Sequence, residues 1–250
     1  MWAILGRMSV RRVNIAGRYC GPPRSGNGGY TAGLLGELME GPCEVTLRAP
    51  PPLELPMTME RDAAGVGLLR REDTLIAEAV AAAFETALPE PVSFAEAERA
   101  SRGYIGFHAH PYPTCFVCGP QRARGDGLTI FPGAVEGRQL VAAPWVPGAD
   151  LCDAQDQVQA RYIWASLDCP SWFGFAAFSP SPPVLLGRLA SVIVRRPHFG
   201  ERCVALGWHT GSEGRRIGCA SALFADDGRC LAYSRSTWVA LKTDPAQESP

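Results

Sequence analysis

Lysine is nearly absent from this sequence. Lys242 is the single lysine among 250 residues, and the other basic side chains are arginines scattered along the chain. The formal net charge is −1, so the chain lacks the strongly basic face that binds a nucleic acid backbone or an anionic membrane surface. We therefore expect no nucleic-acid partner.

Long apolar runs are absent as well. No stretch approaches the roughly 18 apolar residues that a membrane-spanning helix needs, and residues 1–8 are too short for a secretory leader. We therefore expect a cytoplasmic protein that does not associate with membranes. The nine cysteines, an odd number, are then expected to be reduced thiols that act mostly as small apolar side chains.

Histidine is scarce, with four in the chain. His108 and His110 precede Cys115 and Cys118, and two histidines with a C-x2-C pair supply the ligand types of a tetrahedral zinc site. Two prolines compress the spacing, however, and no second C-x2-C pair is present. A Gly-Pro pair directly after the cysteines opposes the helix that a redox C-x-x-C motif needs. The sequence thus favours no metal and no cofactor.

The pattern of apolar residues predicts two halves with the same plan. In the first half it predicts a helix at 30–39 and extended segments at 10–19, 43–48, 55–60, 65–70 and 74–84, of which the last also suits a helix. In the second half it predicts a helix at 155–173 and strands at 127–131, 138–143, 189–195, 202–207, 217–224 and 230–241. The Asp226-Asp227-Gly228 segment predicts a hairpin turn.

One helix against a curved antiparallel sheet buries the apolar faces of both, and each half supplies these parts. The predicted fold class is therefore α+β. We place the N-terminal unit at 1–88, a linker with a short helix (93–102) at 89–112, the C-terminal unit at 113–243 and a tail at 244–250.

Three short motifs carry a resemblance to a known family. CFVCGP at 115–120, followed by GLTIF at 127–131, resembles the opening of many thioesterase-superfamily hotdog domains. NGGY at 27–30 resembles the helix start of acyl-CoA thioesterases. The chain as a whole is similar to the double-hotdog acyl-CoA thioesterase II group. This resemblance implies two curved antiparallel sheets, each wrapping one central helix.

The Gly-rich helix start is a candidate substrate site formed by Asn27, Gly28, Gly29 and Tyr30. The first N–H groups of a helix have no intrahelical acceptor, and the helix dipole adds partial positive charge there. A thioester carbonyl approaching the N–H groups of Gly28 and Gly29 would be stabilised by about 3–4 kcal/mol per donor. The alternative is that Asn27 only caps the helix and the glycines only permit close packing.

Asp168 is the candidate catalytic residue. A carboxylate among tryptophan, leucine and cysteine is costly unless it is hydrogen-bonded or functional, and it can orient or deprotonate an attacking water. The resemblance implies an Asp in this helix acting with a Gln and a Thr from neighbouring strands. The Gln position falls at about Ser236, so Ser236 or Thr237 is expected to substitute. The alternative is that Asp168 is a structural cap before Pro170.

Aromatic residues gather between 145 and 178. Most should be core, and we expect Trp164 and Trp172 to line an acyl tunnel. Cys169 is a weak candidate for a nucleophile, because no histidine lies near it in sequence.

These features predict an acyl-CoA thioesterase-like hydrolase whose partner is an acyl-CoA or an acyl-carrier thioester, and which associates with further copies through its sheets. A non-catalytic acyl-CoA or lipid-binding protein is the main alternative, because the expected Gln is missing. A hydratase is the third, and His198 is its best candidate for the histidine of an Asp/His pair.

Overall fold

The structure of this protein, a computed structural model, describes residues 10–123, 125–180 and 182–241. The predicted tail at 244–250 lies outside the described residues, as do the first nine residues of the predicted N-terminal unit. The three boundaries of the predicted division of the chain stay predictions.

The first half has the predicted order of elements. They are β1 (Arg11–Val13), η1 (Gly17–Tyr19), α1 (Gly28–Gly36), β2 (Cys43–Leu47), β3 (Met57–Arg61), β4 (Gly67–Arg71) and β5 (Thr74–Ala81). The ambiguous segment at 74–84 is a strand, paired with β2 and β4. The predicted strand at 10–19 is only three residues long, because the chain then turns through η1.

The second half opens with short elements and ends with long strands. They are α2 (Phe94–Ser101), η2 (Ile105–Phe107), β6 (Gly133–Ala134), β7 (Val141–Trp145), η3 (Ala149–Leu151), α3 (Ala160–Ala176), β8 (Val184–Ile193), β9 (Cys203–Glu213), β10 (Arg216–Ala225) and β11 (Cys230–Ala240). The predicted hairpin joins β10 to β11, with Gly228 at a φ of 83°. None of the helices in the described ranges has both the length and the apolar character needed to cross a bilayer.

The predicted strand at 127–131 is wrong. The N–H groups of Leu128 and Ile130 donate to the carbonyls of Phe116 and Val117, while Thr129 between them has a φ of 52°. That left-handed conformation breaks the extended backbone that a ladder needs. The segment therefore packs against the 115–118 turn and joins no strand of the sheet.

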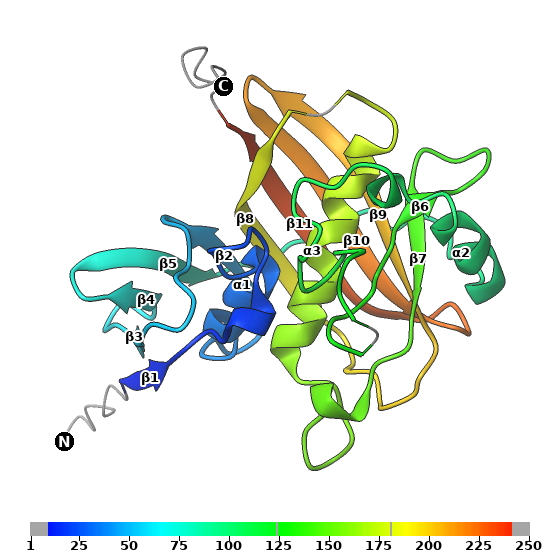
Figure 1. Cartoon of the computed structure of the whole chain (residues 1–250). Helices are drawn as coiled ribbons and strands as arrows, with labels where there is room; N and C mark the ends of the chain where they lie inside the picture. The colour runs from blue at the N-terminus through cyan, green and yellow to red at the C-terminus, as the bar shows by residue number, and fades with distance from the viewer. Residues whose placement is uncertain (1–9, 124, 181, 242–250) are drawn as a thin grey trace.

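The strands of both halves form one sheet, in the order β1-β3-β4-β5-β2-β8-β11-β10-β9-β7-β6 (Figure 1). This corrects the expectation of two sheets. The halves join where β2 pairs antiparallel with β8, with Val45 opposite Leu189. An edge strand presents unpaired N–H and C=O groups, so this pairing satisfies one edge from each half.

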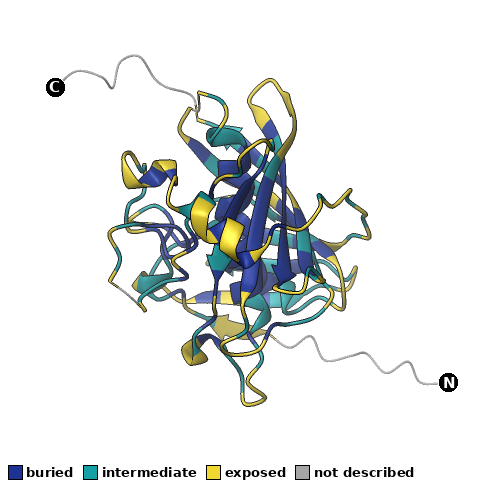
Figure 2. Cartoon of the chain, turned by 90° about the vertical axis from the view of Figure 1, so that its right-hand side faces the viewer, coloured by how far each residue is buried: buried dark blue, intermediate teal, exposed yellow. Residues whose placement is uncertain are grey.

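Apolar side chains pack against both faces of the sheet. The larger core packs α1 and α3 against the sheet and includes Leu35 and Val45 from the first half together with Ile163 and Leu189 from the second. A smaller cluster lies on the other face, where α2 packs mainly against β7 and also contacts β6 and β9. Figure 2 looks onto that side, where the outer face of α2 is exposed and the long strands are buried.

Helices α1 and α3 pack against each other at very short range. Arg161, near the start of α3, donates from Nε and Nη2 to the two carboxylate oxygens of Glu37, the C-cap of α1 (2.9 and 2.8 Å). A Cβ atom at Gly33 would lie 2.6 Å from Arg161 Cα and 2.8 Å from Trp164 Cβ. The helices can approach this closely because α1 presents glycine to α3.

Replacing Gly33 tests this close approach. Helix propensity alone would make Gly33→Ala stabilising by up to about 1 kcal/mol. The new methyl group meets backbone of α3, however, and overpacking of this kind costs about 1–3 kcal/mol. We expect the free energy of unfolding, measured by chemical denaturation, to fall. Gly103→Ala is the control, because its nearest neighbour would be 3.4 Å away; equal effects of the two variants would contradict the interpretation.

Candidate functional site

The start of α1 is capped by Asn27. Its Oδ1 accepts the Tyr30 N–H at 2.8 Å, which satisfies one of the free donors of the first turn. Its side-chain amide is thereby fixed in orientation, and Nδ2 points away from the helix. Gly28 is the first helical residue, so its N–H has no intrahelical acceptor.

Asp168 lies in the middle of α3 and faces the start of α1. Its Oδ2 accepts the Gly29 N–H at 2.9 Å and the Asn27 Nδ2–H at 2.8 Å. A Cβ at Gly29 would lie 2.5 Å from Asp168 Cβ, so only glycine lets the carboxylate reach this N–H. The helix does not end before Pro170 but continues to Ala176. Asp168 therefore caps α1 rather than its own helix.

The second carboxylate oxygen has no partner. Asp168 is 2 % exposed, and its Oδ1 is a buried atom without a hydrogen-bond partner among the described residues. Burial raises the pKa of Asp168 to about 7, and the bonds from Gly29 and Asn27 oppose this rise. Buried polar atoms are nearly always hydrogen-bonded, so an orphaned carboxylate oxygen marks a place for a water or a ligand.

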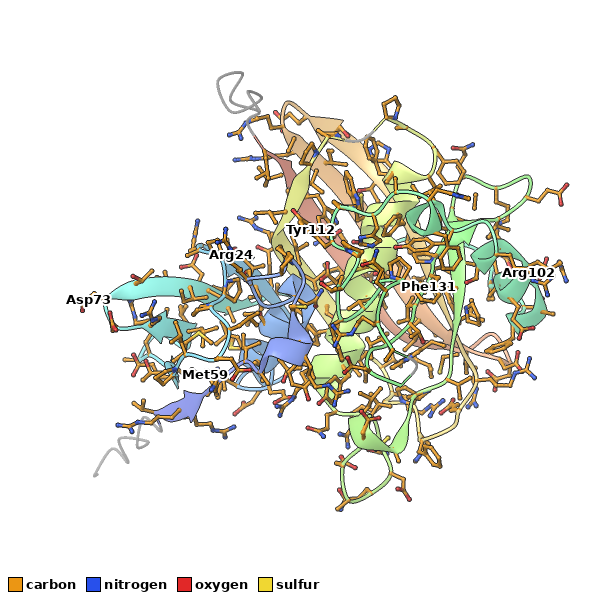
Figure 3. All side chains as sticks on the ribbon, viewed as in Figure 1. Arg24, Met59, Asp73, Arg102, Tyr112 and Phe131 are labelled. Atoms are coloured by element: carbon orange, nitrogen blue, oxygen red, sulfur yellow. The ribbon has the colours of Figure 1, made fainter. Side chains whose placement is uncertain are left out.

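A cavity of about 990 Å³ opens beside this carboxylate. It extends from Asn27, Gly28 and Asp168 along α3 to Ala176, and its wall is completed by segments of β2, β8 and β11. Tyr112, labelled near the middle of the molecule in Figure 3, also lines it. The lining is mostly apolar, and it includes Leu47, Trp172, Phe173, Leu186 and Trp238. A mainly apolar cavity of this size with a few polar groups at one end is the form of a small-molecule site.

The structure brings together part of the predicted site. Asn27, Gly28, Asp168 and Trp172 line the cavity. Gly29 does not line it, and its N–H is occupied by Asp168. The predicted pair of backbone donors at the helix start is thus divided, because only the N–H of Gly28 is left without an acceptor among the described residues.

Two predicted substrate-binding residues belong to the core. The ring of Tyr30 stacks on Tyr19 with centroids 4.3 Å apart. Trp164 packs on Gly33 and Gly36 of α1. Neither residue lines the cavity. Both side chains fill space around the two helices, which is the usual role of buried aromatics.

Ser236 and Thr237 do not reach the carboxylate. Ser236 Oγ donates to Ser171 Oγ at 2.9 Å, and Ser171 in turn donates to the backbone carbonyl of Asp168 at 2.7 Å. Successive side chains of a strand alternate between the two faces of the sheet, so Thr237 points away from the face that carries Ser236 and Trp238. Neither Ser236 nor Thr237 lines the cavity.

Ser171 and Trp238 also support the site, although neither was predicted from the sequence. Trp238 Nε1 donates to Ser171 Oγ at 3.0 Å, so β11, an inner strand of the sheet, fixes the helix turn that carries Asp168. The signal for Ser171 was its position three residues after Asp168, which places it on the same helix face. No local pattern predicts the contact with Trp238, because it depends on the register of β11.

The histidines and cysteines are not grouped as the two-histidine, two-cysteine ligand set that the sequence offered. His110 lines the cavity, whereas His108 and His198 do not. Cys115 and Cys118 also line it, and Cys169 of α3 joins them. The hydratase alternative loses its best candidate, because His198 is exposed and does not line the cavity with Asp168.

Comparisons with known proteins identify the fold. No protein-family model matches the sequence, and no curated protein matches it. Among solved structures, a TesB protein from Mycobacterium avium subspecies paratuberculosis is similar over 94% of this chain and 96% of its own, with a TM-score of 0.59 and 12% identity. A protein assigned as a thioesterase II from Thermobifida fusca has a TM-score of 0.62 and 14% identity, covering 93% and 92% of the two chains.

A third similar structure is described by its fold. It is a protein of unknown function with a hot dog fold from Alicyclobacillus acidocaldarius, which covers 97% of this chain and 96% of its own at 11% identity and a TM-score of 0.52. The chain has a double-hotdog fold. The central helices of the two hotdog units are α1 and α3, so Asn27 and Asp168 come from different units and the polar end of the cavity is composite.

Asn27 offers a direct test of this contact between hotdog units. Asn27→Ala removes the cap of α1, worth about 1 kcal/mol, and a hydrogen bond to a buried carboxylate, worth about 1.5–3 kcal/mol. We expect the free energy of unfolding to fall by about 2–4 kcal/mol in a denaturant titration. Ser93→Ala removes the cap of α2, where no buried carboxylate is involved, and should cost about 1 kcal/mol. A smaller loss for Asn27→Ala than for Ser93→Ala would contradict this role.

Proposed function

We propose that this protein hydrolyses acyl thioesters, with Asp168 as the general base. The observation that carries the proposal is the unpartnered, buried Oδ1 of Asp168, a residue that lines the polar end of an apolar cavity. Oδ2 is held by two donors from α1, so the carboxylate is fixed while Oδ1 is left to accept a bond from water. The likeness to a TesB protein and to a thioesterase II supports the same reaction class.

The proposed reaction begins with a water hydrogen-bonded to Asp168 Oδ1. Its oxygen attacks the thioester carbon while its proton passes to Oδ1. The carbonyl oxygen becomes an oxyanion and accepts the N–H of Gly28 at the positive end of the α1 dipole. The C–S bond then breaks, and the sulfur leaves as a thiol with the proton from Asp168. The products are a carboxylic acid and a free thiol.

The apolar part of the cavity is the proposed acyl site. Ala176 lies eight residues after Asp168 in the same helix, which corresponds to about 12 Å along the axis. An acyl group with its carbonyl at Gly28 would run along this length between α3 and β8. The thiol portion, from an acyl-CoA or an acyl carrier, would remain outside this apolar section.

One observation favours the alternative of a non-catalytic acyl-thioester-binding protein. The residue at the position expected for Gln is Ser236, and it bonds to Ser171 rather than approaching Asp168. The water would then be held by the carboxylate alone. This alternative predicts saturable binding of acyl-CoA, measured as a rise in melting temperature, with no release of thiol.

Asp168→Asn separates the two functions. The amide oxygen can accept the bonds from Gly29 and Asn27 in place of Oδ2, so the cap is kept while the base is lost. We expect kcat for acyl-CoA hydrolysis to fall by about 10²–10⁴, which is the usual contribution of a general base. The assay is thiol release over a panel of acyl-CoAs, corrected for the nine protein cysteines.

The matched control is Asp226→Asn, the same chemical change in a surface ion pair with Arg202. It should leave kcat within about twofold. Full activity of Asp168→Asn would remove Asp168 from the mechanism. Binding of acyl-CoA by the wild-type protein without turnover of any member of the panel would favour the alternative.

Ala176→Phe tests the acyl site. The larger side chain fills the far end of the cavity and leaves the carboxylate untouched. We expect kcat/KM to fall about tenfold or more for long acyl groups and to stay within about twofold for short ones, as compared by initial rates. An equal loss for long and short acyl groups would show that the substrate does not reach Ala176.

A further inference from the structure

Three buried thiols meet beside the cavity. Cys115 and Cys118 come from the turn at 113–119, and Cys169 comes from α3. Their sulfur atoms all lie within 4.8 Å of one another, and the Sγ atoms of Cys115 and Cys169 are 3.8 Å apart. All three side chains line the cavity. The proposed hydrolysis uses none of them.

The spacing of the sulfurs suits a metal. A tetrahedral zinc with Zn–S bonds of about 2.3 Å places two sulfur ligands about 3.8 Å apart, which is the separation of Cys115 and Cys169. A disulfide would require about 2.05 Å. Cys115 and Cys169 are therefore not bonded to each other, and all three cysteines are free thiols. The group as a whole is compact enough to surround one cation.

The turn at 113–119 has the form that directs two cysteines to one ion. C-x2-C is a usual ligand spacing in zinc sites. The Gly119 N–H donates to the Cys115 C=O at 2.9 Å, which closes the turn. A Cβ at residue 119 would lie 2.5 Å from the Cys115 nitrogen, so the turn requires glycine there.

Side-chain donors also converge on the sulfurs. His110 Nε2 lies 3.3 Å from Cys118 Sγ, and its Nδ1 accepts the Tyr112 N–H at 2.9 Å. A neutral imidazole whose Nδ1 accepts carries its proton on Nε2, so His110 donates to the sulfur. Asn27 Nδ2 faces Cys115 Sγ at 3.9 Å. N–H donors of this kind stabilise thiolates bound to a metal.

We propose that Cys115, Cys118 and Cys169 form a trithiolate site for one thiophilic divalent cation of the zinc type. His110 is a positioning residue that donates to Cys118, not a ligand. The fourth position of a tetrahedron is left to a ligand from the cavity, which all three cysteines line. The site does not depend on the proposed hydrolysis.

Cobalt titration tests the site in the full-length, reduced and chelator-treated protein. We expect a thiolate-to-cobalt charge-transfer band that saturates at one equivalent per protein molecule and disappears when zinc is added. Cys169→Ser should weaken cobalt binding by more than about 100-fold, and Cys230→Ser, a half-buried cysteine on β11, should leave it unchanged. His110→Ala should weaken binding by about 10–100-fold and keep the thiolate band at saturating cobalt.

A measurement on the wild-type protein tests the proposal even where the variants fail to fold. Alkylation mapped by mass spectrometry should show that zinc protects Cys115, Cys118 and Cys169 together and leaves the reactivity of the other six cysteines unchanged. The proposal is overturned by the absence of the charge-transfer band or by a band that Cys169→Ser preserves. A disulfide that includes Cys115 or Cys169 would also overturn the proposal. It would appear as two fewer free thiols than the nine cysteines supply, counted in the denatured, unreduced protein.

Discussion

The contact between the Asp168 carboxylate and the start of α1 is the constraint on which the rest of the structure depends. A buried carboxylate without partners is costly. Here two N–H donors and the positive end of a helix dipole offset that cost. The contact needs glycine at position 29, because any side chain would collide with α3. At the other end of α1, the bidentate pair of Glu37 and Arg161 fixes the same two helices.

This helix pair determines where the cavity lies. Because α1 and α3 are locked together over a sheet whose halves meet at β2 and β8, the space between α3 and that junction receives walls from both halves. Asn27 and Gly28 come from the first half, and Asp168 and Trp172 from the second. Neither half alone contains the polar end of the cavity, so the fold and the candidate site are stabilised by the same contacts.

Local patterns predicted most elements and singled out Asp168 as a candidate, because periodicity and a carboxylate in an apolar helix are visible in sequence. They did not predict which N–H groups of α1 would be free, since this depends on Asp168, which lies 139 residues after Gly29. The strand predicted at 127–131 does not form, because Thr129 has a left-handed backbone conformation. Ser236 was placed correctly on a strand, but its hydroxyl bonds to Ser171, a contact set by the register of β11.

Local sequence patterns also could not predict that the three cysteines lie together. In sequence, Cys115 and Cys118 lacked a second pair, and Cys169 lacked a histidine, so each signal alone was weak. The fold joins them because consecutive residues of a helix point about 100° apart. Asp168 therefore faces α1 while Cys169 faces the turn at 113–119. A single turn of α3 thus connects the carboxylate to the cluster of three thiols. Pro170, which cannot donate a backbone hydrogen bond, follows directly. Ser171 then anchors that turn through Trp238, so a displacement of this turn would alter both groups together.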